Sequence, residues 1–187
     1  MKGFGNNLRT NKKSTEKKGK SIQKEQLITN ALSLHSNGKI KEASEIYNFL
    51  IKNKFYDPRI LNNLGSIYSQ IKQFDKAILL FNESIKKFPN SLEAYSNLAS
   101  ILVIKGRSDT AKNILKKAIE LNPNHLKPYS NLAGIYVGDG NFKEAEILLR
   151  KSLDINPKDI NTLVNLACVM KDLGNLKEAE KFLRNAL

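Results

Sequence analysis

The sequence lacks most of the residues on which metal, redox and nucleophilic chemistry depend. It contains one cysteine, two histidines and no tryptophan in 187 residues. Cys168 alone cannot form an internal disulfide, and it is isolated from His35 and His125, so neither a metal site nor a Cys–His nucleophile is indicated. We therefore expect no metal, no cofactor and no catalytic residue within this chain, and a reducing compartment.

Long apolar runs are missing as well. No stretch approaches the ~18 consecutive apolar residues of a membrane-spanning helix. The N-terminus is charged but is not followed by an apolar segment, so it does not have the pattern of a signal peptide. These absences favour a cytoplasmic protein without a membrane span.

Positive charge is abundant and concentrated at the N-terminus. The net charge is +13, and residues 1–20 carry many lysines but only Glu16 as an acidic residue. Such a polar segment cannot bury enough apolar surface to offset its chain entropy, so we expect a disordered basic tail over residues 1–23. We interpret it as a solubilising tail, and binding of an anionic partner is the alternative interpretation.

After this tail, one pattern recurs every 34 residues. Apolar residues at helical spacing come before and after a short turn, and strand-like runs are absent, so each unit is expected to be a pair of helices. We therefore predict an all-α fold with units at 24–57, 58–91, 92–125, 126–159 and 160–187, the last of them incomplete. The recurring alanines are Ala43, Ala77, Ala111, Ala145 and Ala179, and the closing prolines are Pro89, Pro123 and Pro157.

The unit resembles the tetratricopeptide repeat (TPR) family, whose members carry small and large apolar residues at set positions. This resemblance implies an α-solenoid, the TPR superhelix, of about five helix–turn–helix units. The sequence departs from the family pattern by having no tryptophan, and by Phe55 where the first unit would have its closing proline. The matching residues of the fourth unit are Tyr129, Leu132, Ala133, Tyr136, Gly140, Ala145, Leu149, Ser152 and Pro157.

Several residues are typical of helix starts. Asp57 before Pro58 is expected to cap the second unit, because aspartate accepts a backbone hydrogen bond and proline fits the first helical position. Asparagine followed three residues later by glutamate has the spacing of a reciprocal capping box. That spacing occurs at Asn141 with Glu144 and at Asn175 with Glu178.

One polar residue recurs as regularly as the apolar ones. Asn63, Asn97, Asn131 and Asn165 occupy the same place in four units, with Thr29 there in the first. A buried position would not hold asparagine four times, since each buried amide needs hydrogen-bond partners. In the TPR family this side of the first helix lines the concave surface. The arrangement resembles the asparagine ladder of O-linked N-acetylglucosamine transferase arrays, which implies contact with the main chain of a bound peptide.

The amide chemistry suits that role. An asparagine side chain both donates and accepts, so it can pair with any peptide group. Helices pack about 10 Å apart and an extended chain rises about 3.3 Å per residue, so each asparagine would meet every third residue of the ligand. The other predicted peptide-binding residues are Asn62, Ser66, Ser100, Arg59 and Lys127.

We therefore interpret the chain as a protein–protein interaction module that holds an extended segment. One alternative is the substrate-recruiting arm of a glycosyltransferase or sulfotransferase whose catalytic domain lies on a longer chain. A carboxylate clamp of the chaperone-binding type is disfavoured by Ile28 and Glu93 at clamp positions. Nucleic acid is not an expected partner, because the paired lysines of the second helices lack interleaved exposed aromatics. Because the fifth unit is incomplete, we expect a longer parent chain or self-association through the C-terminal face.

Overall fold

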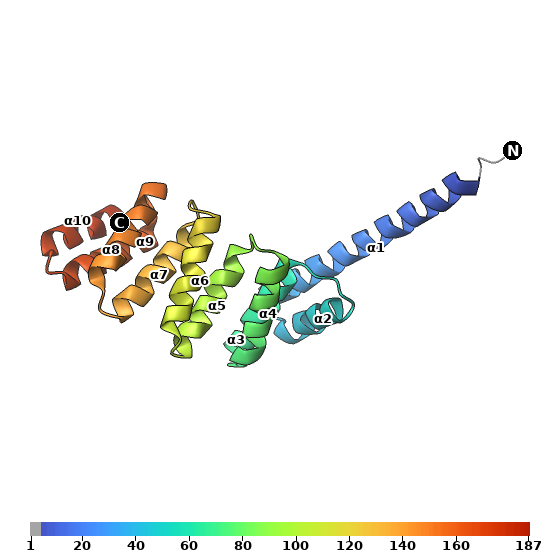
Figure 1. The fold of residues 1–187 in the computed structure, drawn as a ribbon, viewed down its shortest axis with the longest axis horizontal. Coiled ribbons are helices and arrows are strands. Elements are labelled where there is room, and N and C mark those ends of the chain that lie inside the picture. The colour runs from blue at the N-terminus through green and yellow to red at the C-terminus, as the bar shows by residue number, and fades with distance from the viewer. Residues whose placement is uncertain (1–4) are drawn as a thin grey trace. The chain divides into compact units, whose positions relative to one another are not determined.

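The computed structural model describes residues 5–187, with side chains from Ser21 onward. Over these residues the secondary structure is ten α-helices without a strand (Figure 1), which confirms the all-α prediction. The helices are α1 (Gly5–Ser36), α2 (Ile40–Lys52), α3 (Pro58–Gln70), α4 (Phe74–Lys87), α5 (Leu92–Ile104), α6 (Ser108–Leu121), α7 (Leu126–Gly138), α8 (Phe142–Ile155), α9 (Ile160–Asp172) and α10 (Leu176–Ala186).

The chain divides into two compact units. The N-terminal unit is Met1–Gln73, with α1 to α3, and the C-terminal unit is Phe74–Leu187, with α4 to α10. The boundary falls at the turn between α3 and α4, inside the repeat predicted at 58–91. The compact units are therefore not whole numbers of sequence repeats.

Helix α1 differs from the tail that the sequence predicts. Residues 1–4 of the predicted disordered segment lie outside the described residues, and from Gly5 onward the backbone is helical. Lysine, glutamate and glutamine are good helix formers, and no proline interrupts the segment, so a composition that cannot form a packed core can still form a helix. Among the α1 side chains that the structure describes, Ile28 and Ala31 are buried, and α1 packs on α2.

In the C-terminal unit the helices pack in chain order, each against the next (Figure 1). The first helices of successive repeats also contact one another, α5 with α7 and α7 with α9. We call the face that these three helices share the inner face. The recurring alanines are buried in every repeat, where a small side chain lets two helices approach closely.

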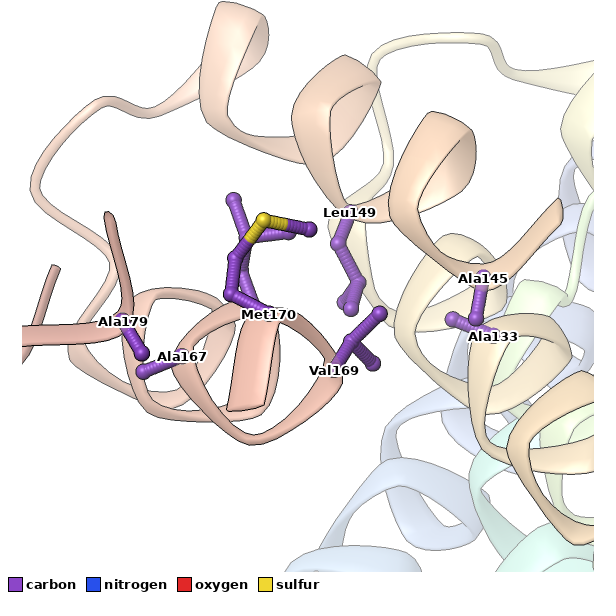
Figure 2. Close-up of a cluster of buried hydrophobic side chains, with 8 residues drawn as sticks. Ala133, Ala145, Leu149, Ala167, Val169, Met170 and Ala179 are labelled. Atoms are coloured by element: carbon purple, nitrogen blue, oxygen red, sulfur yellow. The ribbon is translucent and has the colours of Figure 1, made fainter. Parts of the chain in front are cut away.

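The last four helices share one apolar core. Figure 2 shows Leu149 of α8 with Val169 and Met170 of α9, and Ala133 of α7 and Ala179 of α10 belong to the same cluster. Each helix buries one stripe against its neighbours, as expected of a repeat array without a central core. The position of α9 therefore depends on α7, α8 and α10 together.

Two of the helices begin at an aspartate whose side chain caps them. The Asp57 side chain accepts from the Arg59 backbone N–H at 2.9 Å with Pro58 at the first helical position, which confirms the predicted cap. Asp159 caps α9 in the same way, accepting from the Thr162 N–H at 2.8 Å. The sequence analysis did not identify this second cap.

The predicted capping boxes are wrong. Asn141 and Asn175 are the N-cap residues of α8 and α10, but neither side chain makes a capping hydrogen bond. Their ψ angles of 67° and 61° depart from the extended backbone that a capping side chain requires. Glu178 instead accepts from Arg150 of α8 at 2.7 Å.

Candidate functional site

The inner face of the C-terminal unit carries three of the four recurring asparagines. Asn97, Asn131 and Asn165 lie at equivalent places on α5, α7 and α9. Asn165 is exposed, and Asn97 and Asn131 are partly buried. Asn63 lies on α3 and belongs to the N-terminal unit.

Two cavities open beside these asparagines. The α5–α7 cavity has a volume of about 390 Å³ and is lined by Ser100 and Asn131 among others. The α7–α9 cavity has a volume of about 150 Å³ and includes Asn165 in its lining. Ser130 and Gly134 of α7 line both, so the cavities lie on either side of one helix edge.

The cavities are apolar and nearly uncharged although the chain carries a net charge of +13. The α5–α7 cavity has no charged residue in its lining, and Asp172 is the only one at the α7–α9 cavity. Val103 and Ile104 stand at the α5–α7 cavity with 38% and 64% of their surface exposed. The inner face is therefore suited to apolar or neutral groups and does not attract anions.

Asn131 and Asn165 have amide groups available for a ligand. Among the described side chains, no hydrogen-bond partner is found for either amide. Asn97 differs, since it already interacts within the protein. Ser100 is exposed, and its hydroxyl donates to the Ser96 carbonyl at 3.0 Å. Lys127 is exposed in the first turn of α7 and lines neither cavity.

The candidates in the N-terminal unit are placed differently. Asn62 is only 2% exposed, so its predicted contact with a peptide is not compatible with this structure. The Asn63 amide donates to the Arg59 carbonyl of its own helix at 2.8 Å. Ser66 is partly buried and already interacts within the protein. These side chains are engaged locally, whereas those on α7 and α9 are not.

Arg59 is held by two carboxylates rather than presented to a ligand. Its guanidinium donates to Glu25 at 2.8 Å and to Asp57 at 3.0 Å. Burial on its own would raise the pKa of Asp57, but the hydrogen bonds from Arg59 outweigh it and the pKa is lowered. The same guanidinium lowers the pKa of Glu25 through its hydrogen bond. Arg59 therefore joins α1 to the start of α3.

Apart from Ser100, the sequence analysis missed the residues of the inner face that follow the asparagines. Ile104 and Asp172 lie seven residues after Asn97 and Asn165, which is two helical turns along the same face. Cys168 lies three residues after Asn165 and lines the α7–α9 cavity. Extending each asparagine position by three and by seven residues would have identified all three.

Other kinds of site find no support in the described part of the chain. Among residues 21–187, no group of three or more histidine, cysteine, aspartate or glutamate side chains is placed to hold a metal ion. No helix within the described residues is both long enough and apolar enough to cross a membrane.

Family models and solved structures agree on the type of repeat. Tetratricopeptide repeat models match residues 102–161 and 160–187, and the model of the N-terminal TPR repeats region of Psidin matches residues 6–121, more than half of the chain. No curated protein sequence matches the chain significantly.

Several solved structures have a similar fold. The crystal structure of MamA protein gives a TM-score of 0.70 at 23% identity, covering 88% of this chain and 90% of that one. TTC0263, a thermophilic TPR protein of Thermus thermophilus, gives 0.71 at 20% identity, covering 88% and 90%. MamA from Desulfovibrio magneticus RS-1 also gives 0.71 at 20% identity, covering 87% and 93%. At these identities the likeness concerns the fold. The chain belongs to the tetratricopeptide repeat family.

Proposed function

We propose that this protein is an interaction module whose C-terminal unit holds an extended protein segment on its inner face. The observation that carries the proposal is the pair Asn131 and Asn165, which occupy the same place in successive repeats and line adjoining cavities. Membership of the TPR family supports a scaffold role in protein–protein interaction.

The chemistry of the pair favours recognition of a main chain. A primary amide offers donors and an acceptor, which complement the N–H and C=O of a peptide group. The contacts of α7 with α5 and α9 imply a helix spacing of about 8–10 Å, so the amides repeat at about every third residue of an extended chain. The adjoining apolar cavities would take side chains of the same segment.

The test compares two double variants. Asn131→Ala with Asn165→Ala removes the amides on the inner face, and Asn82→Ala with Asn113→Ala removes two exposed amides on the second helices α4 and α6. Each protein is used as bait in a crosslinking pull-down from the native cell, followed by mass spectrometry. Circular dichroism checks that both variants remain helical.

We expect the inner-face variant to lose the partners of the wild type while the control retains them. Asn131 is partly buried and the other three asparagines are exposed, and none lies in the apolar core, so both variants should fold. If all three baits capture the same proteins with the same yield, the inner face is not the binding surface.

Self-association stays a separate prediction. Helix α10 leaves Leu176 and Leu183 exposed, at 65% and 46% of their surface. Two copies could cover these side chains mutually. Analytical ultracentrifugation of the wild type and of Leu183→Gln distinguishes a dimer that this change dissociates from a monomer that it leaves unaltered.

A further inference from the structure

The two cavities are related by the repeat itself. Each lies between first helices that contact one another, α5 with α7 and α7 with α9. Equivalent points on adjoining repeats are therefore separated by about the packing distance of helices, 8–10 Å. Volumes of about 390 and 150 Å³ exceed by several-fold the roughly 30 Å³ share of one water molecule. Each cavity is therefore large enough to receive an aliphatic side chain.

This separation selects among extended conformations. In a β-strand, side chains on one face recur about every 6.6 Å. Two side chains on that face are therefore about 6.6 or 13 Å apart, and neither distance matches the separation of about 8–10 Å. In polyproline II the chain has three residues per turn and rises about 3.1 Å per residue, so residues three apart face the same side about 9 Å apart. Only the polyproline II spacing coincides with the repeat of the cavities.

The charge of the lining restricts the ligand further. Neither cavity has a lysine or arginine in its lining, although the chain contains 31 of them. Asp172 at the α7–α9 cavity has only the neighbouring Lys171 as an ion-pair partner among the described residues, at a long 3.8 Å. A basic group of the ligand would complement this carboxylate, and an acidic one would be repelled.

We propose that the inner face of α5, α7 and α9 selects a polyproline II-like segment. This segment carries two apolar side chains three residues apart, and a basic residue next to the apolar side chain at α9, on the side away from α5. One apolar side chain occupies the α5–α7 cavity, the other the α7–α9 cavity, and the basic residue meets Asp172. The inference rests on the proposed function and adds the conformation, the spacing and the charge of the segment.

Gly134 provides a direct way to close both cavities. It lines each of them, its φ is that of an ordinary helix, and a Cβ added there would meet no atom within 4 Å. Leucine is a better helix former than glycine, so Gly134→Leu should fold while its side chain fills the space beside α7. Gly138, the last residue of α7, is equally open but lines neither cavity, which makes Gly138→Leu the matched control.

The probes are fluorescent twelve-residue peptides of glutamine, alanine and proline that carry two leucines. The leucines are separated by two, three or four positions, and a lysine or a glutamate follows or precedes the pair. Fluorescence anisotropy should show the tightest binding for the three-residue spacing with lysine, by about ten-fold over the other spacings. Gly134→Leu should abolish this preference, Gly138→Leu should keep it, and Asp172→Lys should reverse the choice between lysine and glutamate.

The single cysteine supplies an independent readout. Cys168 is exposed and lines the α7–α9 cavity, so a bound peptide should slow its alkylation by a maleimide. Unchanged alkylation at a peptide concentration that saturates the anisotropy signal overturns the inference.

The other outcomes separate this inference from the proposed function. Equal binding of all spacings, together with loss of binding in the Asn131→Ala and Asn165→Ala variant, overturns the inference and leaves the proposed function in place. Binding that survives both that variant and Gly134→Leu overturns both.

Discussion

Two buried serines illustrate how the setting of one side chain decides its contribution. Ser152 of α8 shares a hydrogen bond of 3.2 Å with the Thr162 hydroxyl. Ser84 occupies the equivalent place in α4, but the position equivalent to Thr162 is Ala94, and the Ser84 hydroxyl has no partner among the described residues. A buried hydroxyl without a partner loses its hydration without compensation.

We therefore predict opposite effects of the same substitution at these serines. Ser84→Ala should leave the free energy of unfolding unchanged or raise it by up to about 1 kcal/mol, whereas Ser152→Ala should lower it by about 1 kcal/mol. Urea denaturation followed by circular dichroism measures both. A larger loss for Ser84→Ala than for Ser152→Ala would contradict this account.

The Arg59 ion pairs predict a dependence of stability on acid. Because the pKa of Asp57 and of Glu25 is lowered in the folded protein, their contribution is present above the ordinary carboxylate pKa and is lost as the pH falls through the lowered values. The Tm should therefore decrease below about pH 4. Arg59→Gln should make that decrease shallower, because Asp57 then keeps only its capping bond.

The effect should be small, since the Arg59 side chain is 43% exposed and solvent screens the pairs. Lys41→Gln, at an exposed lysine of α2, is the control for the loss of one positive charge. Parallel acid profiles for Arg59→Gln and the wild type would show that the pairs do not contribute.

At the scale of the element, the turns that join paired helices share one backbone conformation. Four of them use glycine with a positive φ, and in the turn after α3 Lys72 takes the same conformation at φ 60°. The turn hydrogen bonds correspond, since Lys72 N–H donates to Ser69 and Gly106 N–H donates to Val103, at 3.0 and 2.9 Å. The glycines are Gly38, Gly106, Gly140 and Gly174.

This conformation is strained for lysine because its Cβ crowds the following carbonyl, at a cost of about 1–2 kcal/mol. Lys72→Gly should therefore raise the free energy of unfolding by about 1 kcal/mol after the greater flexibility of glycine in the unfolded chain is subtracted. Gly106→Lys should lower it by a similar amount. Chemical denaturation checks both changes, and destabilisation by Lys72→Gly would mean that the lysine side chain stabilises the turn by more than the strain.

At the scale of the whole molecule, stability is distributed along the array. Met170 is buried in the cluster shared by α7, α8, α9 and α10 (Figure 2). Met170→Ala should cost about 2–5 kcal/mol through the cavity it leaves. Because each repeat packs only on its neighbours, hydrogen exchange should accelerate in α7 to α10 while α5 and α6 remain protected.

Leu115→Ala in α6 tests whether a substitution nearer the other end of the C-terminal unit also affects hydrogen exchange only in neighbouring helices. Leu115 is fully buried, so its loss should accelerate exchange in α5 to α7 instead. Uniform acceleration across α4 to α10 in both variants would indicate one cooperative unit rather than a repeat array.

The net charge of +13 allows a further test at this scale. If neutral cavities and amides bind the partner captured in the pull-down, the affinity for that partner should change little with salt, and deletion of residues 1–20 should not affect it. Binding of an anionic partner would instead weaken steeply on a log–log plot. If the affinity falls steeply with salt, and this dependence disappears when residues 1–20 are deleted, the basic segment is favoured as the binding element.

Much of the architecture is determined by local features of the sequence. The 34-residue period, the alanines at close helix contacts and the Asp57–Pro58 start each act over a few residues, so the helix pairs could be predicted from the sequence. The same period placed Asn131 and Asn165 on equivalent faces of α7 and α9. That placement follows from helix geometry and needs no knowledge of the neighbouring repeats.

Only the tertiary structure decided which of these side chains are available. Asn62 and Asn63 are adjacent in the sequence, but a helix turns by about 100° per residue, and Asn62 is buried. The Arg59 guanidinium donates a hydrogen bond to Glu25, which lies 34 residues earlier in the sequence. The cavities beside Gly134 likewise exist because α5, α7 and α9 approach one another. Burial and pairing depend on residues brought together from different repeats, and a pattern within one repeat does not contain that information.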